Sequence, residues 1–385
     1  MTTDIFTISL CAALLLLAFV PPLFNPFFRK IKTKENGEEG DNGKQQQLPP
    51  ISIVITAHDS APELRTNLPL ILNQQYPAGV QVIVVAERGD SETEDVLKLI
   101  SAENERLYYT LIPESSRYMS RKKLAMTIGV KAAKHEWVML TEPSYAPVSD
   151  QWLATMARNC QNDIDIVTGY SNFDNDAPLY CRFERLQTEC YQLRETQKHI
   201  AYRHFGANLL IRKSIFMDNE GFRGNLNLVR GEYDFIVNKF GTAENTATEI
   251  SPEAWLREKA PTHKAWKYRH MYYLETRKLL ERSFRHRLVF NFDQTMLHIP
   301  FIIMVSAIAV AAVMKLWIIM GAAITSLLIN TIIRSIFLSK KAKMFGEKIP
   351  AILALPLQLA VIWHNLHYSV QHRLADKLDF TTHKL

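Results

Sequence analysis

Hydrophobic positions divide the 385-residue chain into apolar ends and a mixed centre. Four stretches contain no Asp, Glu, Lys or Arg: residues 5–28, 294–314, 316–333 and 349–371. Each has about 18 residues or more, roughly the length that an α-helix needs to cross the apolar core of a bilayer. The pattern therefore predicts a membrane protein with an N-terminal transmembrane anchor over residues 1–28 and two to three C-terminal transmembrane helices over residues 294–371.

The first stretch has the features of an uncleaved anchor. Asp4 stands where a signal peptide carries basic residues, and no small-residue cleavage site follows the stretch. Basic residues directly follow both this stretch and the third one: Arg29, Lys30, Lys32 and Lys34, then Arg334, Lys340, Lys341 and Lys343. Because basic flanks tend to stay cytoplasmic, we expect the N-terminus outside and residues 29–293 inside.

The C-terminal stretches leave two questions open. Only Lys315 separates the second stretch from the third, which predicts either two short spans joined by a tight turn or a re-entrant pair. The last stretch contains His364 and His367 together with Pro350 and Pro356. An amphipathic, partly interfacial helix is therefore an alternative to a full crossing there.

Between the apolar ends, short β-rich runs alternate with amphipathic helical runs. Residues 29–48 form a polar linker, and a folded domain is predicted over residues 49–264. Its apolar runs include residues 51–56, 80–86 and 136–141, with helical patterns between them. Such alternation predicts an α/β fold with a mostly parallel, Rossmann-like sheet that carries helices on both faces.

Residues 265–293 combine aromatic and cationic side chains beside the first C-terminal stretch. This composition is typical of an interfacial amphipathic helix on anionic lipid headgroups. Since the juxtamembrane position already accounts for the basic patch, we expect no nucleic-acid partner. Residues 372–385 are a tail.

Composition and charge exclude several classes of protein. The chain has 45 Lys and Arg against 39 Asp and Glu, a net charge of +6, with 47% hydrophobic residues. These values exclude a disulfide mini-protein, a collagen and an ordinary disordered chain. The spans contain almost no charge, which argues against a transporter or channel. The four cysteines show no C-x-x-C spacing, so neither a zinc site nor a redox pair is expected.

Candidate chemistry lies where the predicted strands end. His58 and Asp59 follow the first strand, Glu87 follows the second, and Glu142 and Ser144 follow the strand at residues 136–141. Ligands of parallel α/β sheets bind beyond the carboxyl ends of the strands. Acidic groups there can accept hydrogen bonds from a nucleobase or ribose and can hold a divalent ion against a diphosphate. The sequence therefore predicts a nucleotide-sugar site in outline.

Three blocks of the sequence resemble family 2 glycosyltransferases with the GT-A fold. PPISIVITAHDS, NLPLILNQQYP and VQVIVVAE resemble the start of that domain, and RKKLAMTIGVKAAKHEWVMLT followed by WL resembles its second block. FGANLLIRKSIF, a GF pair and GEYDFIVNK resemble its acceptor-side block. The resemblance covers roughly residues 49–269, with membrane spans on both sides as in ceramide-glucosyltransferase-like and processive-synthase-like members. It implies a hexosyltransferase-like enzyme that uses a UDP- or GDP-sugar.

The resemblance also implies roles for donor-side residues. Thr56, His58 and Asp59 match the segment that cradles the nucleobase, and Glu87 matches the second acid beside it. Lys123 matches the basic residue that opens the helix near the donor. Plainer alternatives are a solvated helix face for Lys123 and a turn cap for His58 and Asp59.

The metal motif departs from the family pattern. The usual Asp-x-Asp is replaced by Glu142, Pro143 and Ser144, so one carboxylate remains. Magnesium and manganese prefer oxygen ligands and take one or two carboxylates together with phosphate and water. The resemblance therefore implies a divalent Mg or Mn site at Glu142 and Ser144 that is weakened.

The acidic pair of the acceptor side departs as well. Family members carry adjacent acids, one of which removes the proton of the acceptor hydroxyl, whereas Tyr233 here separates Glu232 from Asp234. General-base catalysis needs a carboxylate within hydrogen-bond reach of that hydroxyl. Asp234 is the candidate base and Glu232 the alternate. The plain alternative is that both are exposed acids at a helix start, where the dipole favours them.

A third family element, a Gln-x-x-Arg-Trp-like segment, has no clean counterpart. Trp266, Arg269 and His270 lie about where it should be, as candidate acceptor or phosphate contacts. Trp266 could stack on a sugar ring, and Arg269 could pair with phosphate. An aromatic belt at the membrane interface explains the same residues equally well.

The leading hypothesis is an inverting membrane glycosyltransferase. We expect it to act on a lipid or glycan acceptor at the cytoplasmic face of the inner (plasma) membrane, in cell-envelope glycan biosynthesis. The three weakened motifs keep a rival open: a catalytically degenerate membrane subunit that binds partner membrane subunits or a glycan as a scaffold.

Overall fold

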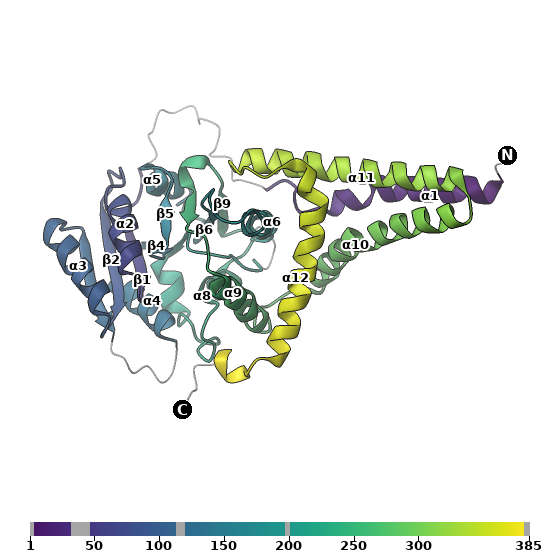
Figure 1. The fold of residues 1–385 in the computed structure, drawn as a ribbon. Helices are drawn as coiled ribbons and strands as arrows, with labels where there is room; N and C mark the ends of the chain where they lie inside the picture. Colours follow the sequence, from purple (N-terminus) through teal and green to yellow (C-terminus); the bar gives the residue numbers. More distant parts are fainter. Residues whose placement is uncertain (1–3, 32–46, 113–119, 197–200, 381–385) are drawn as a thin grey trace. The chain divides into compact units, whose positions relative to one another are not determined.

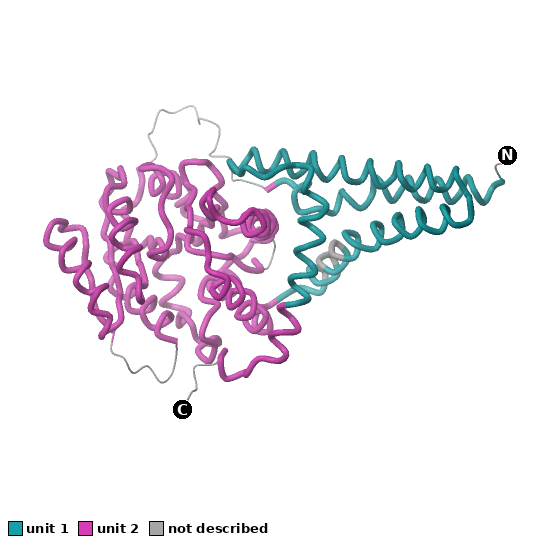
Figure 2. Tube along the Cα trace, in the orientation of Figure 1, with its two compact units in different colours: residues 1–30, 282–367 teal, residues 31–281, 368–385 magenta. Residues whose placement is uncertain are grey.

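A computed structural model describes residues 4–31, 47–112, 120–196 and 201–380. The chain separates into two compact units, drawn in different colours in Figure 2. One unit consists of residues 1–30 and 282–367, and the other of residues 31–281 and 368–385. The larger unit therefore runs past the predicted domain boundary at residue 264 and includes the C-terminal segment. Most of the predicted polar linker, residues 32–46, lies outside the described part of the chain.

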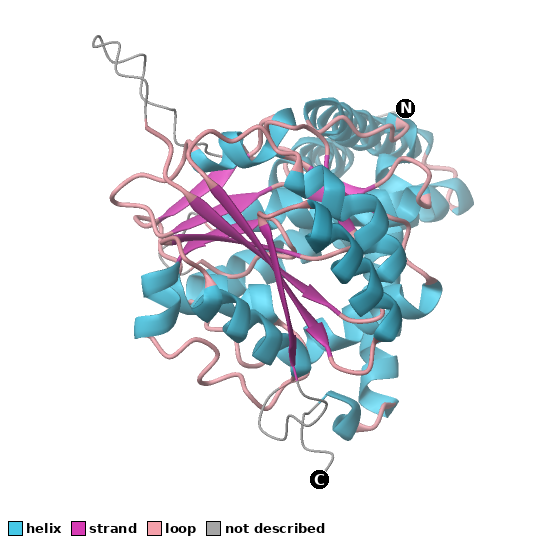
Figure 3. Cartoon of the chain, turned by 90° about the vertical axis from the view of Figure 1, so that its left-hand side faces the viewer, coloured by secondary structure: helices cyan, strands magenta, loops and turns pink. Residues whose placement is uncertain are grey.

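A seven-stranded sheet organises the larger unit (Figure 1). Its order is β3-β2-β1-β4-β8-β6-β9, and only β8 runs antiparallel to its neighbours. The strands are β1 (Ile51–Ala57), β2 (Val80–Glu87), β3 (Leu107–Ile112), β4 (Trp137–Thr141), β6 (Ile166–Gly169), β8 (Leu209–Arg212) and β9 (Thr246–Glu249). Figure 3 shows helices on both sides of these strands. The predicted α/β class and mostly parallel sheet are confirmed.

Helices connect and cover the strands of this sheet. They are α2 (Ala61–Leu72), α3 (Ser91–Glu103), α4 (Arg121–Ala132), α5 (Trp152–Ala157), α6 (Leu179–Glu195), α7 (Lys213–Asp218), α8 (Glu232–Phe240) and α9 (His263–Thr276). A second sheet has the order β5-β10-β7, formed by β5 (Tyr145–Pro147), β10 (Leu256–Glu258) and β7 (Ser171–Phe173). The predicted interfacial segment therefore begins as a helix, α9, that belongs to the larger unit.

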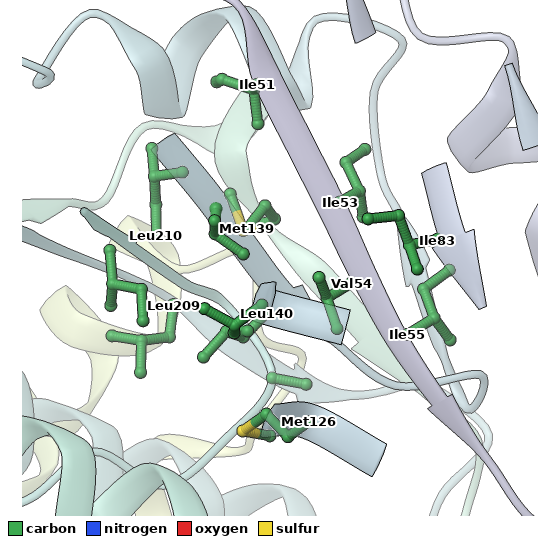
Figure 4. Packing of buried hydrophobic residues seen from close by; sticks show 14 of the residues in the cluster. Ile51, Ile53, Val54, Ile55, Ile83, Met126, Met139, Leu140, Leu209 and Leu210 are labelled. Atoms are coloured by element: carbon green, nitrogen blue, oxygen red, sulfur yellow. The ribbon is translucent and has the colours of Figure 1, made fainter. Parts of the chain in front are cut away.

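The central strands are held by apolar packing. All seven residues of β1 are buried, and Figure 4 shows Ile53, Val54 and Ile55 among side chains of the neighbouring strands and of α4. Full burial of one such side chain contributes about 1.5–3 kcal/mol. Helix α4 crosses β1 closely, since a Cβ atom at Gly129 would lie 2.3 Å from Val54 Cγ1. This close contact sets the position of the first turn of α4, which borders the site described below.

Among its described residues, the smaller unit contains three helices that are long and apolar enough to cross a membrane. The candidate spans are Ile5–Phe24, Thr295–Val313 and Trp317–Met344. They fall in α1 (Ile5–Phe19) with the following 3-10 turn, α10 (Phe284–Val313) and α11 (Trp317–Met344). A turn with Lys315 in the left-handed region joins α10 to α11. Helix α12 (Ala354–Leu374), which covers most of the last charge-free stretch, is not among the candidate spans.

Polar contacts join the helices of the smaller unit. Asn330 of α11 donates to the carbonyl of Leu17 at 3.2 Å and accepts a hydrogen bond from Arg334 at 2.6 Å. Arg334 also donates to Gln358 of α12 at 2.8 Å. Helix ends and intramembrane polar groups need such internal partners because lipid supplies none.

Candidate functional site

Two pockets lie beside each other in the larger unit. The first, which we name the strand-end pocket, is a cavity of about 560 Å³ beyond the carboxyl ends of β1, β2 and β4. The second, which we name the aromatic pocket, is a cavity of about 310 Å³ bordered by α8 and α9. Three residues line both: Lys122, Glu142 and Arg230. The two pockets therefore share one wall.

The strand-end pocket brings together four of the five predicted donor residues. Thr56, His58, Asp59 and Glu87 all line it. The parallel register explains why, since Ala57 at the end of β1 pairs with Ala86 at the end of β2. Residues that follow two adjacent parallel strands emerge at the same edge of the sheet.

Hydrogen bonds and ion pairs fix the turn that follows β1, at the edge of this pocket. Asp59 adopts a left-handed conformation, with φ of 46°, and its backbone N–H donates to Asp90 at 2.8 Å. His58 Nδ1 lies 3.4 Å from a carboxylate oxygen of Glu87, which also accepts from Arg121 at 2.6 Å. The Thr56 hydroxyl is buried and has no hydrogen-bond partner within the described residues. Polar groups with spare hydrogen-bonding capacity thus line a concave edge, as a nucleoside site requires.

The predicted metal residues also line the strand-end pocket. Glu142 and Ser144 follow β4, whose Thr141 pairs with Ile55 of β1. The Glu142 carboxylate accepts from the Lys122 ammonium at 2.5 Å. Burial acts to raise the pKa of Glu142, but Lys122, Arg230 and Arg269 outweigh it and hold that pKa below its usual range. Glu142 is therefore an ionised carboxylate surrounded by cations.

Another group of acidic and imidazole side chains could hold a divalent cation. His58, Asp59 and Asp90 each offer one ligand atom, and these atoms lie within 4.8 Å of one another. His58 and Asp59 are exposed, and Asp90 already accepts from the backbone N–H groups of Asp59 and Thr93. Oxygen-rich groups of this kind suit hard divalent ions.

Lys123 lies away from both pockets. Its side chain is fully buried, and its ammonium donates to the carbonyls of Asn225 and Leu228 at 2.5 Å each. Burial lowers the pKa of Lys123 to about 8, against a smaller opposite effect of Glu232. Lys123 thus fastens the loop that leads to Arg230, whereas the neighbouring Lys122 lines both pockets.

The aromatic pocket contains both acids of the predicted catalytic pair. Glu232 and Asp234 line it, and Tyr233 between them lines it as well. Asp234 is engaged in a buried ion pair, since its Oδ1 accepts from Arg203 Nε at 2.8 Å. Burial raises the pKa of Asp234 even so. Glu232, by contrast, has a buried Oε1 without a hydrogen-bond partner in the described part of the chain.

Local backbone geometry explains how α8 presents these acids. Gly231 precedes the helix with φ of 95°, in the left-handed region that glycine tolerates best. A Cβ at this position would lie 2.4 Å from a Thr276 side-chain carbon at the end of α9. Both acids are buried in the first turn of α8, so they are not the exposed helix-start acids of the plain alternative.

Of the three predicted residues on α9, only Arg269 reaches the aromatic pocket. It donates to both carboxylate oxygens of Glu258, at 2.6 and 3.2 Å. Trp266 is instead buried among Phe173, Tyr180 and other apolar residues. His270 bonds to Glu184 and stacks on Tyr368, with ring centres 4.5 Å apart.

Several pocket residues were not predicted from the sequence. They are Lys122 and Arg230 in the shared wall, Arg203, His204 and Phe205 beneath the aromatic pocket, and Leu378 and Asp379 beside the strand-end pocket. The basic run at residues 121–123 pointed to Lys122, but helix periodicity alone does not say which lysine of a run faces a site. No local pattern in the sequence predicts that Leu378 and Asp379 border the strand-end pocket. The C-terminal segment is held there by contacts with residues far away in the chain: the Val229 N–H donates a hydrogen bond to the Phe380 carbonyl at 3.0 Å.

His204 adds a neutral polar group to the aromatic pocket. Its side chain is fully buried, and neither ring nitrogen has a hydrogen-bond partner among the described residues. Burial, together with the nearby cations Arg185 and Arg203, lowers the pKa of His204 to about 3. An aromatic and polar lining of this kind suits a ligand with ring faces and hydroxyl groups.

Comparison with known proteins agrees with this geometry. A family model described as glycosyltransferase like family 2 matches residues 49–237, which include the strand-end residues and both acids of α8. The sequence matches no curated protein.

A solved structure shows the same fold. The chain resembles the mannosyltransferase PcManGT from Pyrobaculum calidifontis, in complex with GDP-Man and Mn2+, with 15% identity and a TM-score of 0.55 over 96% of this chain and 99% of that one. It is also similar to S. aureus TarS 1-349 in complex with UDP-GlcNAc, with 12% identity and a TM-score of 0.42 over 64% of this chain and 70% of that one. Over residues 49–237, which include the strand-end residues and both acids of α8, the chain therefore carries a glycosyltransferase domain of family 2 type with a GT-A fold.

Proposed function

We propose that this protein is an inverting membrane glycosyltransferase that moves a sugar from a nucleotide-sugar donor to a lipid or glycan acceptor. The observation that carries the proposal is the shared wall: Lys122, Glu142 and Arg230 line both the strand-end pocket and the aromatic pocket. A donor in the first pocket and an acceptor in the second would meet there. Holding two reactants in contact geometry is itself a large part of catalysis.

The strand-end pocket is the proposed donor site. Thr56, His58, Asp59 and Glu87 would contact the nucleoside, whose ribose and base offer the hydrogen-bonding groups that these side chains complement. The donor would be a UDP- or GDP-sugar. Both nucleotide types occur in the solved structures named above, one with GDP-Man and the other with UDP-GlcNAc.

The aromatic pocket is the proposed acceptor site, with the base on α8. The acceptor hydroxyl oxygen would form a bond to the anomeric carbon while the bond from that carbon to the diphosphate breaks. The hydroxyl proton would pass to a carboxylate, and the nucleoside diphosphate would leave with the electron pair. Of the two acids, Glu232 suits the base better than Asp234, because Asp234 is already paired with Arg203.

The family resemblance implies a divalent Mg or Mn ion at Glu142 and Ser144. The residues present fit such an ion poorly. A second carboxylate is missing, and the remaining one accepts a hydrogen bond from Lys122. No step of the reaction is therefore assigned to a metal at these two residues.

A membrane location supports a lipid or lipid-linked acceptor. Three helices of the smaller unit are apolar enough to cross a bilayer, and basic residues flank them on the side expected to face the cytoplasm. We therefore place the catalytic domain at the cytoplasmic face of the inner (plasma) membrane, in cell-envelope glycan biosynthesis. Partner membrane subunits would be needed if three spans do not suffice to pass a growing glycan.

Nucleotide binding by the detergent-purified protein tests the proposal. A ligand that binds only the folded state raises the melting temperature. We expect UDP or GDP, and the corresponding sugars, to stabilise the wild type but not a Glu87→Gln variant to the same extent. A sample that no nucleotide stabilises would favour the scaffold subunit over the enzyme.

The acceptor is tested separately. Transfer of label from the stabilising nucleotide sugar should depend on added membrane lipid. Equal transfer to soluble acceptors without lipid would contradict the lipid acceptor and leave the donor site intact.

A further inference from the structure

Lys122 occupies the wall between the two pockets, at the second position of α4. Its ammonium lies 2.5 Å from Glu142 Oε1 and 5.5 Å from the centre of the Tyr233 ring. The side chain retains 18% of its exposure and the Glu142 side chain 25%, so both remain open to a ligand. The family resemblance implies a basic residue near the donor at the start of this helix, but it gives that residue no part in place of a metal ion.

The ammonium competes with a metal ion for the same carboxylate. A divalent ion needs several oxygen ligands at about 2.0–2.6 Å, and Glu142 is the one carboxylate left in the motif after β4. A second cation bound to Glu142 would lie within a few ångströms of the Lys122 ammonium. Because like charges at such a distance repel strongly in a partly buried site, the carboxylate can serve one cation or the other.

We propose that the Lys122 ammonium, held in place by Glu142, binds the diphosphate of the donor and supplies there the positive charge that a divalent ion supplies in a metal-dependent glycosyltransferase. This inference rests on the proposed function, since it needs a nucleoside diphosphate in the strand-end pocket. It assigns Lys122 as a catalytic residue and Glu142 as the residue that positions it.

The charges of the shared wall support this assignment. Arg230 is exposed, lines both pockets and forms no ion pair within the described ranges. Lys122 and Arg230 together carry two positive charges against the single carboxylate of Glu142. Arg269, the next cation, is already neutralised by Glu258. The wall is therefore net positive, as the recognition of a diphosphate requires.

The start of α4 fixes the direction of the lysine side chain. Ser120 caps the helix, and its hydroxyl accepts from the Lys123 backbone N–H at 3.2 Å. Lys123 in turn is anchored to two carbonyls of the loop at residues 225–228. With Lys123 turned into the interior, its neighbour Lys122 faces the pockets. The partial positive charge of a helix N-terminus adds to that of the ammonium.

In the proposed reaction, Lys122 acts on the leaving group. As the bond from the anomeric carbon to the diphosphate oxygen breaks, the electron pair remains on that oxygen. Lys122 would donate a hydrogen bond to the diphosphate and stabilise the charge that develops there. The acceptor proton passes to Glu232, so protons and charge balance without a metal ion.

Binding measurements with the full-length protein in detergent test the inference. UDP, GDP and the corresponding monophosphates would be titrated in EDTA and again in MnCl2, against the wild type, Lys122→Gln and Lys131→Gln. Lys131 is a matched control, because it is an exposed lysine of the same helix that lines neither pocket. We expect wild-type affinity for one diphosphate to be the same in both conditions.

Loss of the charged contact should weaken diphosphate binding by Lys122→Gln about tenfold to a hundredfold. Monophosphate binding should change less, and Lys131→Gln should behave as the wild type. Lys122→Arg keeps the charge and should retain affinity to within a few-fold. Melting temperatures without nucleotide would show whether each variant is folded.

The double variant Lys122→Gln/Glu142→Gln separates ligand binding from mere neutralisation of Glu142. If Lys122 only balances the carboxylate, the double variant regains diphosphate affinity, and the inference is overturned. Wild-type binding that requires Mn2+ also overturns it but leaves the donor site standing. Failure of every nucleotide to bind, with or without Mn2+, would overturn the proposed function itself.

Discussion

The strand-end pocket and the aromatic pocket share a wall but are built differently. The first consists of side chains that follow parallel strands, where the register of the sheet aligns them. The second is assembled from segments far apart in sequence, namely the turn into β5, residues 203–206, the start of α8 and one face of α9. A site at strand ends is therefore visible in a sequence, whereas a site made by packing of remote segments is not.

The forces that hold the two regions differ as well. Beneath the strand-end pocket, β1, β2 and β4 pack through aliphatic side chains. Around the aromatic pocket, ion pairs join different segments: Arg203 pairs with Asp234 of α8, and Arg269 of α9 pairs with Glu258 of β10. Removing one partner of such a pair leaves an uncompensated buried charge, so the aromatic side should be the more sensitive to single charge changes.

The largest expected effect concerns catalysis in the aromatic pocket. Glu232→Gln should lower sugar transfer by about 10²–10⁴-fold, the usual contribution of a general base, while nucleotide affinity stays unchanged. Initial rates with labelled donor, together with nucleotide titrations, measure both quantities. Near-normal transfer by Glu232→Gln would remove Glu232 from the role of base.

Asp234→Asn should act mainly on stability. The change leaves Arg203, whose side chain is 7% exposed, without its carboxylate partner. Breaking a buried pair in this way costs about 3–5 kcal/mol of unfolding free energy. Thermal unfolding of the two variants side by side makes the distinction: Glu232→Gln should melt near the wild-type temperature and Asp234→Asn well below it. The reverse order would exchange the roles assigned to the two acids.

A smaller effect is expected from the strand-end pocket. Glu87→Gln removes the charge that Arg121 and His58 face, and should weaken nucleotide binding about tenfold, the size of one charged hydrogen bond. The unfolding free energy should change little, because the Glu87–Arg121 pair is partly exposed. Isothermal titration with UDP and GDP checks the affinity, and a variant as tight as the wild type would place the nucleoside elsewhere.

The smallest effect is a pH dependence on the aromatic side. Burial raises the pKa of Glu189 to about 7, although Arg185 and Ser171 partly offset that rise. In the folded state, the Glu189 carboxyl therefore stays protonated up to about pH 7, whereas in the unfolded chain it loses its proton from about pH 4.5 upward. Glu189 therefore makes the free energy of unfolding fall as the pH rises from about 4.5 to 7, and it causes no further change above pH 7.

Glu189→Gln tests this sign. As the pH rises through that window, the melting temperature of Glu189→Gln should increase by a few degrees relative to that of the wild type. The control is Glu103→Gln at an exposed position of α3, for which the difference should stay constant. If the melting-temperature difference between Glu189→Gln and the wild type did not change with pH, Glu189 would not be the group that holds the proton.

Much of the fold could be predicted from the sequence. The apolar runs became β1, β2 and β4, and three of the four charge-free stretches became candidate spans. The last stretch did not, because prolines and polar residues lower its hydropathy. Residues 265–276, part of the segment 265–293 that the sequence predicts as an interfacial helix, belong to α9 of the larger unit and border the aromatic pocket. Aromatic and cationic side chains suit a membrane surface and a pocket wall equally well, so composition alone does not predict the second.

The sequence by itself determined the α/β class, the candidate spans, and the donor-side residues at the strand ends, because these depend on local periodicity and on the direction of parallel strands. Only the tertiary structure decided that Lys122 rather than Lys123 faces the pockets and that Trp266 and His270 lie away from them. It also decided that Asp234 is paired, while one Glu232 oxygen has no hydrogen-bond partner among the described residues. These outcomes depend on which remote segment packs against each side chain. Contacts between segments far apart in the chain leave no mark on the local pattern of residues.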